Sequence, residues 1–376
     1  TCTATYKVSE DTKATLTATA DSGSIFTSWW ESANSPVYSR VETCVYQKVC
    51  TLTLRDSVAV VVKVYFNSNK KVKNDFDGDG KSDVIWLNTA NGAVAIWRMN
   101  GEAINKRDYV VKDMPADWEI KGTGDFNGDG QADVLWQNKS NGDVYMWLMA
   151  NSWEDIEISA DSGYLIHGLP KNWEFRAIGD FYGNGKDDIM WQDTTTGDVI
   201  LWLMEGAKIV GGNFVVKGVK AEWTVKATGD FNGDGKSDVL WQDTTTGDVV
   251  LWLMNGLSTP TISYIAKAMP NNWQIKTVED FDGDGKVDIL WQDTTTGDVA
   301  VWLMDGAKIL NGNYVMRGMP GNWQFLTAGD YNGDGKTDVL WRDTSSGDVA
   351  VWLMDGSKTT SSRVVIRGLT LDWWTK

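Results

Sequence analysis

Short loops rich in aspartate and glycine are the residues of this chain best suited to chemistry. The motif D-F-x-G-D-G-x-x-D, or a close variant, begins at Asp75, Asp125, Asp180, Asp230, Asp280 and Asp330. Acidic or amide side chains occupy loop positions 1, 3, 5 and 9, and position 7 can add a backbone carbonyl. Because this spacing lets oxygens converge while the glycines permit a tight turn, the loops predict sites for a hard cation, Ca²⁺ above all.

The six copies differ in the number of carboxylates they offer, so we expect up to six Ca²⁺ of unequal affinity. The first and fifth copies carry four carboxylates, whereas the second, fourth and sixth have Asn at position 3 and keep three. The third copy has Tyr182 at position 3 and Asn184 at position 5, and we expect it to be the weakest site or empty. The predicted ligands are Asp75, Asp77, Asp79, Lys81 and Asp83; Asp125, Asn127, Asp129, Gln131 and Asp133; Asp180, Asn184, Lys186 and Asp188; Asp230, Asn232, Asp234, Lys236 and Asp238; Asp280, Asp282, Asp284, Lys286 and Asp288; and Asp330, Asn332, Asp334, Lys336 and Asp338.

An EF-hand and a metal-free polar turn are the two rival interpretations of these loops. An EF-hand needs a bidentate Glu at position 12 and a helix after it. Position 12 is a tryptophan in every copy, from Trp86 in the first to Trp341 in the last, and it falls within a strand pattern. Six copies with the same spacing also argue against a simple polar turn. The loops are therefore interpreted as strand–loop–strand calcium sites.

The elements that position these loops repeat about every 50 residues. Each repeat has an apolar period of two and contains four short strand patterns, such as V-L-W-Q and D-V-V-L-W-L-M, in which both faces are apolar. Strands covered on both faces and repeated at this interval predict the four-stranded antiparallel blades of a β-propeller. We expect an all-β fold with six blades, and seven remains an alternative. Most of the periodic tryptophans are interpreted as packing between blades.

The ends of the array indicate how the ring closes and where the domains divide. The first repeat lacks its W-x-V-K strand, and the chain finishes with a segment at Trp373 that aligns with it. We expect this C-terminal strand to complete the first blade and remove two sheet edges. The predicted domains are a small β domain at residues 1–66, a linker at 67–74 and the propeller at 75–376.

Composition excludes several classes of function. The net charge of −16 argues against nucleic acid and anionic lipid as partners, since both require clustered Lys and Arg. No apolar stretch approaches the roughly 20 residues of a membrane span. A single histidine and the absence of nucleophile-elbow, phosphate-loop and zinc motifs predict that the chain is not an enzyme.

Residues 75–376 resemble the FG-GAP/VCBS repeat family of calcium-binding β-propellers, as in the integrin α-subunit head, through motifs such as D-F-N-G-D-G-K-S-D-V-L-W. This resemblance implies extracellular or cell-surface placement and calcium in the loops. Residues 1–66 look like a small β repeat of bacterial secreted and surface proteins. That resemblance implies a disulfide between Cys44 and Cys50, leaves Cys2 unpaired, and suggests a fragment or processed form.

Three functions remain open at this point. The first is a binding or adhesion module for surface glycans or proteins, with the non-periodic Trp153 and Trp374 as candidate contact residues. The second is a structural subunit of a surface layer, fibre or appendage, which would assemble with itself. The third is an accessory domain of a polysaccharide-acting enzyme. The sequence does not identify the ligand.

Overall fold

The computed structural model describes residues 71–151 and 155–375, and before residue 71 it describes only the backbone of five strands. The chain divides into two compact units, Thr1–Lys71 and Val72–Lys376. In the first unit, β1 (Cys2–Tyr6), β5 (Val60–Ser68) and β3 (Ser24–Ser32) form one sheet. A second sheet pairs β2 (Thr12–Thr17) with β4 (Val49–Leu54). The predicted disulfide lies outside the described residues, because Cys44 is not described and the side chain of Cys50 is not placed.

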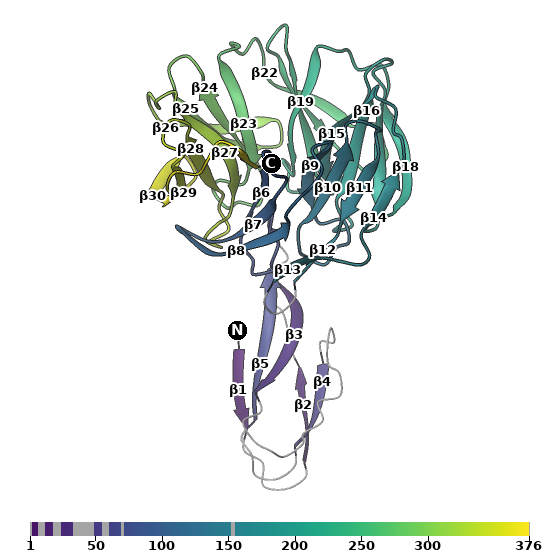
Figure 1. Ribbon diagram of the computed structural model, residues 1–376, viewed down its shortest axis with the longest axis vertical. Helices are drawn as coiled ribbons and strands as arrows, with labels where there is room; N and C mark the ends of the chain where they lie inside the picture. Colours follow the sequence, from purple (N-terminus) through teal and green to yellow (C-terminus); the bar gives the residue numbers. More distant parts are fainter. Residues whose placement is uncertain are drawn as a thin grey trace. The chain divides into compact units, whose positions relative to one another are not determined.

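The second unit is a ring of six four-stranded antiparallel sheets, which confirms the predicted all-β, six-bladed propeller (Figure 1). A seventh blade is not formed by the described residues. Blade 1 orders its strands as β31 (Trp373–Thr375), β6 (Val84–Asn88), β7 (Val94–Asn100) and β8 (Ala103–Val111). Blade 2 orders them as β9 (Trp118–Gly124), β10 (Asp133–Asn138), β11 (Val144–Trp147) and β14 (Gly163–Ile166).

The remaining four blades follow one pattern in chain order, innermost strand first. Blade 3 is β15 (Trp173–Gly179), β16 (Asp188–Asp193), β17 (Val199–Met204) and β18 (Ile209–Val216). Blade 4 is β19 (Trp223–Gly229), β20 (Asp238–Asp243), β21 (Val249–Leu253) and β22 (Thr261–Ala266). Blade 5 is β23 (Trp273–Glu279), β24 (Asp288–Asp293), β25 (Val299–Asp305) and β26 (Lys308–Met316). Blade 6 is β27 (Trp323–Gly329), β28 (Asp338–Asp343), β29 (Val349–Asp355) and β30 (Lys358–Ile366).

The second strand of each blade supplies the largest buried side chains. Its tryptophans are at most 1% exposed, and they are Trp86, Trp136, Trp191, Trp241, Trp291 and Trp341. Each lies against a tryptophan of the third strand, with ring centroids 4.6 Å apart for Trp86 and Trp97. Because neighbouring blades cover both faces of these strands, the apolar run on each face is satisfied. These two tryptophan sets are therefore core residues, as the sequence predicted.

Blade 1 is assembled from both ends of the propeller sequence. In β31, Trp373 is opposite Asn88 and Thr375 is opposite Trp86. The innermost strand of blade 1 thus comes from the last residues of the chain, while its other three strands follow residue 83. This pairing links the first and last repeats, so β6 and β31 cover edges that would otherwise be open.

Blade 2 departs from the pattern between its third and fourth strands. There β12 (Met149–Asn151) and β13 (Ile156–Ile158) form a separate hairpin, and β14 is short. This is the connection that the sequence shows to be five residues longer than in the other repeats. Trp153, predicted as a contact residue, lies outside the described residues. No helix that could cross a membrane occurs in the described part of the chain.

Candidate metal sites

Each aspartate loop joins the innermost strand of a blade to its second strand, so the loops gather at one end of the ring. Residues 125–133, for example, connect β9 to β10. In blade 1 the loop at residues 75–83 precedes β6, and its innermost strand arrives from the C-terminus. The glycines at loop positions 4 and 6 have positive φ, as in Gly78 (72°) and Gly80 (83°). Positive φ is readily available only to glycine, which explains why these two positions do not vary.

The first aspartate of each loop organises the backbone around itself. In the first loop, the amide of Gly78 donates to Oδ1 of Asp75 (2.7 Å), and the amide of Gly80 donates to Oδ2 (2.8 Å). The same two bonds recur in the other five loops. A carboxylate has about four lone-pair positions. The first aspartate therefore keeps acceptor capacity for a cation.

The aspartate at position 9 ties its loop to the end of the third strand. The amides of Phe76 and Met99 donate to the two oxygens of Asp83, at 3.0 and 2.9 Å. The pattern recurs at Asp133, Asp238, Asp288 and Asp338. The spacing of the loop residues predicts position 9 only as a metal ligand and does not indicate this second role. The one signal in the sequence is the methionine that recurs at the end of every third strand.

Asp188, at position 9 of the third loop, is the exception. The amide of Met204 donates to its Oδ1 (3.1 Å), but its buried Oδ2 has no hydrogen-bond partner. The amide of Phe181, which would serve that oxygen, donates to the carbonyl of Gly179 instead (3.0 Å). A buried carboxylate oxygen without a donor is costly unless a cation or proton neutralises it. The third loop therefore retains one oxygen suited to a metal.

Hydrogen bonds join all six loops into a closed ring. The position-8 amide of each loop donates to the position-1 carbonyl of the preceding loop, as in Ala132 to Asp75 (2.7 Å). The series closes where the amide of Ser82 donates to the carbonyl of Asp330 (2.7 Å). The remaining donor–acceptor pairs, at 2.8–2.9 Å, are Asp187 to Asp125, Ser237 to Asp180, Val287 to Asp230 and Thr337 to Asp280. A cation that rigidifies one loop therefore also fixes a hydrogen-bond partner of the next.

Two loops bring three carboxylates together. One oxygen from each of Asp75, Asp77 and Asp83 lies within 4.8 Å of the others, and Asp280, Asp282 and Asp288 form the equivalent group. Position 5, which was also predicted as a ligand, is not part of either group. Asp79 instead accepts the backbone amide of Lys81 (2.9 Å) and pairs with its ammonium (2.7 Å).

Burial and mutual repulsion raise the pKa of Asp75, Asp77 and Asp83 in the first loop and of Asp282 and Asp288 in the fifth. Burial is the main cause for Asp83, whose pKa rises to about 8, with Asp77 and Asp75 adding repulsion. Burial likewise raises the pKa of Asp75 and of Asp288 to about 7. Such groups remain ionised at neutral pH most readily when a cation is bound. Buried, crowded, oxygen-only donors on a hydrogen-bonded loop fit Ca²⁺.

The other loops show the same rise at position 9. Burial raises the pKa of Asp133 to about 8 and that of Asp188, Asp238 and Asp338 to about 7. In the second, fourth and sixth loops the position-3 asparagine accepts the position-5 amide, as in Asn127 and Asp129 (2.9 Å). In the third loop, Tyr182 is 52% exposed and contacts the turn at Gly256. It supplies no carboxylate, in keeping with the expectation of a weak third site.

Three comparisons place the chain among known proteins. The family described as FG-GAP-like repeat matches residues 230–291 and 280–341, each of which starts at a loop aspartate and ends at the second-strand tryptophan of the following blade. No curated protein matches the sequence. Among solved structures, the chain is similar to one from a nidogen/laminin complex, at 13% identity and TM-score 0.48, covering 74% of this chain and 92% of that chain.

Two further solved structures match this chain with lower TM-scores. One is Raptor from Chaetomium thermophilum, with 12% identity and TM-score 0.41, covering 80% of this chain and 26% of that chain. The other is the dihydro-heme d1 dehydrogenase NirN in complex with DHE, with 14% identity and TM-score 0.40, covering 79% of this chain and 57% of that chain. At this distance these likenesses carry no argument about function.

Proposed function

We propose that this six-bladed β-propeller, of which residues 230–341 match the FG-GAP-like repeat family, is a calcium-stabilised, non-catalytic module that binds glycans outside the cell. Calcium would supply positive charge to the carboxylate groups at one end of the ring. In the first and fifth loops it would be held by the three clustered aspartates of each. The hydrogen-bonded loop backbones hold the blades in register. The outer strands then form a rigid binding surface.

The observation that carries the glycan proposal is a row of exposed aromatic side chains. The outermost strand of five blades carries one aromatic residue at the same register, just after a β-bulge. These residues are 41–60% exposed, and they are Tyr109, Tyr164, Phe214, Tyr264 and Tyr314. Blade 6 has Val364 at this position. Repeated exposed aromatics are unusual on a soluble surface and mark binding sites more often than isolated ones do.

Each aromatic side chain of the row lies among other groups that suit a sugar. In blade 5, Tyr314 lies 6.2 Å from Trp273, and the guanidinium of Arg317 is 3.5 Å from the ring centroid of Tyr314. A pocket of about 220 Å³ opens here, lined by these two aromatic rings together with Trp302 and Asn313. Apolar ring faces beside a few polar groups are the usual lining of small-ligand sites.

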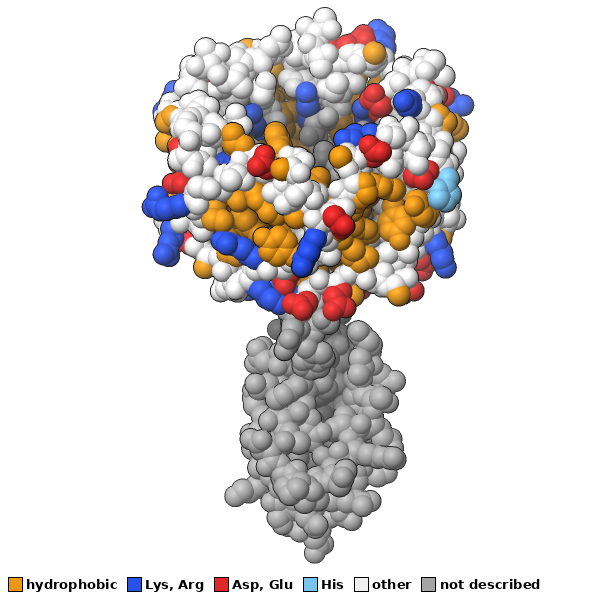
Figure 2. Space-filling model, viewed as in Figure 1, with side chains coloured by type: hydrophobic (Ala, Val, Ile, Leu, Met, Phe, Trp, Pro, Cys, Tyr) orange, Lys and Arg blue, Asp and Glu red, His pale blue; other side chains and the backbone are white. Residues whose placement is uncertain are grey.

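The surface around this row is mixed rather than uniformly charged. Figure 2 shows one face of the propeller, where apolar side chains gather in patches with acidic and basic side chains between them. A glycan presents both apolar ring faces and hydroxyl groups, so it matches such a surface. A partner that is recognised by charge alone does not match this mixed surface.

A glycan array probed with the calcium-loaded chain tests this function. We expect specific binding that a Y264A/Y314A variant loses, because it removes two ring faces from exposed positions without changing the core. The control is L310A, which truncates an exposed apolar residue of the same strand, 51% exposed, that is not aromatic. Absence of any glycan binding, or equal binding by all three proteins, would refute the proposal.

A further inference from the structure

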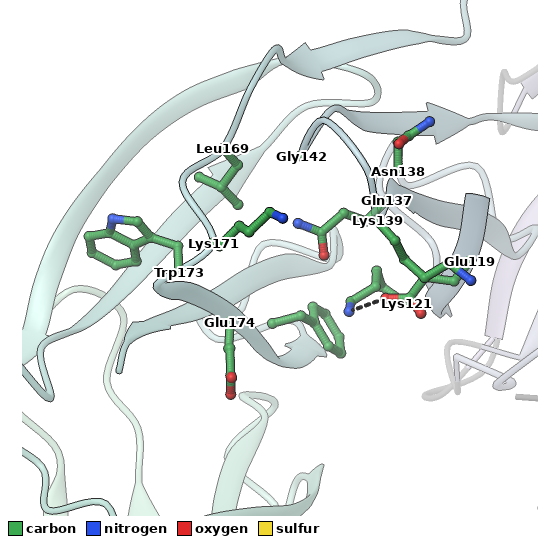
Figure 3. A pocket seen from close by; sticks show the side chains of 11 residues that line it. Glu119, Lys121, Gln137, Asn138, Lys139, Gly142, Leu169, Lys171, Trp173 and Glu174 are labelled. Carbon is green, nitrogen blue, oxygen red and sulfur yellow. Dashed lines mark hydrogen bonds and ion pairs between the residues drawn. The ribbon is translucent and has the colours of Figure 1, made fainter. Parts of the chain in front are cut away.

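The pocket between blades 2 and 3 departs from its counterparts around the ring. It has a volume of about 330 Å³ and lies at the end of the propeller opposite the aspartate loops. Its lining includes Lys121, Gln137, Asn138, Lys139 and Lys171, shown in Figure 3. Three lysines in one pocket stand out on a chain whose net charge is −16.

Three substitutions relative to the other repeats each make this pocket more positive. Asn138 stands where blades 3 to 6 have aspartate. Lys139 stands where the other five blades have threonine. Lys171 stands where the equivalent residues are Ala116, Ala221, Asn271, Gly321 and Leu371. Two changes in the same lining have the opposite sign, since Glu119 and Glu174 stand where blades 4 to 6 have Thr224, Gln274 and Gln324. Together the changes leave the pocket with more lysines than carboxylates.

The replaced threonine has a structural role that the lysine does not take over. In blade 3 the hydroxyl of Thr194 donates to the carbonyl of Asn172 (3.0 Å), and the threonines of blades 1, 4, 5 and 6 make the equivalent bond. In blade 2 the backbone amide of Lys139 still donates to the carbonyl of Asp117 (2.8 Å), so the turn is kept. The lysine side chain is exposed instead of bonded to the turn.

The acidic residues near the pocket are already paired. The ammonium of Lys121 lies 2.8 Å from the carboxylate of Glu119, and the guanidinium of Arg176 lies 2.9 Å from that of Glu174. In Figure 3 the carboxylate of Glu174 points away from Lys171 and Gln137, which extend toward each other. Among the described residues, no carboxylate lies within ion-pair distance of Lys139 or Lys171. Both ammonium groups therefore retain their capacity to bind an anion.

We propose that this pocket binds a hexuronate unit, a sugar that carries a carboxylate, within a larger glycan. The proposal deepens the glycan-binding function above and rests on it. Lys139 and Lys171 bind the carboxylate, since ammonium–carboxylate hydrogen bonds are stronger than neutral ones. The amides of Gln137 and Asn138 can both donate to and accept from sugar hydroxyls. The pocket is near the lower end of the size range of ligand sites, about 300–1,000 Å³, which suits one sugar unit.

An acidic peptide is the other ligand with this charge, and the lining favours a sugar over it. The pocket places the side-chain amides of Gln137 and Asn138 beside its lysines, and these amides can form hydrogen bonds with hydroxyl groups. Its apolar side chains are the largely buried Leu169 and the rings of Trp173 and Phe175. Seven of the eleven lining residues are polar or charged, which suits a ligand that carries hydroxyl groups along its length.

Calorimetric titration of the whole, calcium-loaded chain with a galacturonate oligomer and with a neutral galactose oligomer of equal length tests this inference. We expect the acidic oligomer to bind more tightly, and the K139Q/K171Q variant to lose about tenfold of that affinity. The control K308Q/K358Q removes the same charge from exposed positions in β26 and β30 and should bind as the parent does.

The outcomes separate this inference from the proposed function. Equal affinity for both oligomers, or loss of binding in the control pair as well, would overturn the hexuronate site while leaving glycan binding intact. Binding of a poly-glutamate peptide at the same lysines in preference to galacturonate would overturn it too. If neither oligomer nor any glycan on the array binds, both proposals fail.

Discussion

The guanidinium of Arg98 lies 3.7 Å from the carboxylate of Asp77, within the first aspartate loop. Its Nε also donates to Asp108 (2.6 Å), which holds the guanidinium in place. The equivalent residue of blade 5 is Leu303, and the cation that acts on Asp282 is instead Lys336 of the neighbouring loop. Two loops with the same number of carboxylates therefore differ in the cation beside position 3, which in the first loop is a guanidinium from its own blade.

We predict that replacing Arg98 with leucine strengthens calcium binding at the first loop by about tenfold, since a competing positive charge is removed from a partly buried site. Titration with Ca²⁺ followed by calorimetry measures the change. The reciprocal variant L303R should weaken the fifth loop by a similar factor. Unchanged affinities in both variants would show that the two loops do not hold the cation as described.

At pH ~5.5, below the pKa of about 7 for Asp288, replacing this residue with asparagine should destabilise the calcium-free protein by about 1–3 kcal/mol. The carboxyl group accepts the amides of Phe281 and Met304 (both 2.9 Å), and an asparagine can accept only one of them. Urea unfolding in the presence of chelator measures the effect. The matched control is D284N, an exposed position outside the carboxylate group, which should change stability by less than about 0.5 kcal/mol. Equal losses of stability in D288N and D284N would show that the aspartate at position 9 has no special structural role.

The pH dependence of stability should reverse when calcium is removed. Burial raises the pKa of Asp83 to about 8 and that of Asp288 to about 7, against about 3.9 in an unfolded chain. A carboxyl group with a raised folded-state pKa costs nothing below pH ~4, and its ionisation lowers stability as the pH rises through 7 to 8. The calcium-free protein should thus melt at a lower temperature near pH ~8.5 than near pH ~5.5.

The calcium-loaded protein should show the opposite trend, because Ca²⁺ binds only the ionised carboxylates and so gains affinity with rising pH. Thermal melts of both forms across this range provide the comparison. The account would be contradicted by a calcium-free protein that becomes more stable as the pH rises.

Two adjacent tryptophans test the closure of the ring. Trp373 is half-buried, packs against the core shared by blades 1 and 6, and offers its carbonyl to the guanidinium of Arg342 (2.7 Å), whereas Trp374 is 65% exposed. We predict that W373A costs about 2–4 kcal/mol of unfolding free energy and W374A less than about 0.5 kcal/mol. Chemical denaturation measures both. Similar losses in the two variants would mean that β31 does not close the first blade through Trp373.

The blades could be predicted from the sequence because their signals are local. The alternation of apolar residues, the interval between tryptophans and the glycines of the loops all lie within one repeat. The missing strand before Asp75 and the extra strand at Trp373 likewise indicated how the ring closes. Where the blade is irregular, after Met149, the sequence showed only that five residues were added, and not that they form a separate hairpin.

The site was predicted less completely, because its details depend on contacts between elements. The sequence placed the loop carboxylates together and predicted Asp79 as a ligand, but it did not show the ion pair between Asp79 and Lys81. Arg98, the cationic neighbour of Asp77, lies in β7. The spacing of the loop residues does not predict this contact. The exposed aromatic row was also not predicted. In the sequence, Tyr264 and its equivalents look like ordinary strand residues, and only the structure shows that the outermost strands leave them exposed.

Counting bound calcium in the purified chain while measuring its melting temperature with and without chelator tests the central claim most directly. The account predicts several Ca²⁺ per chain, with the third loop filled last, and a melting temperature that falls by ten degrees or more, on the order of several kcal/mol, when they are removed. A chain that holds no calcium, or one that melts at the same temperature after its removal, would contradict it.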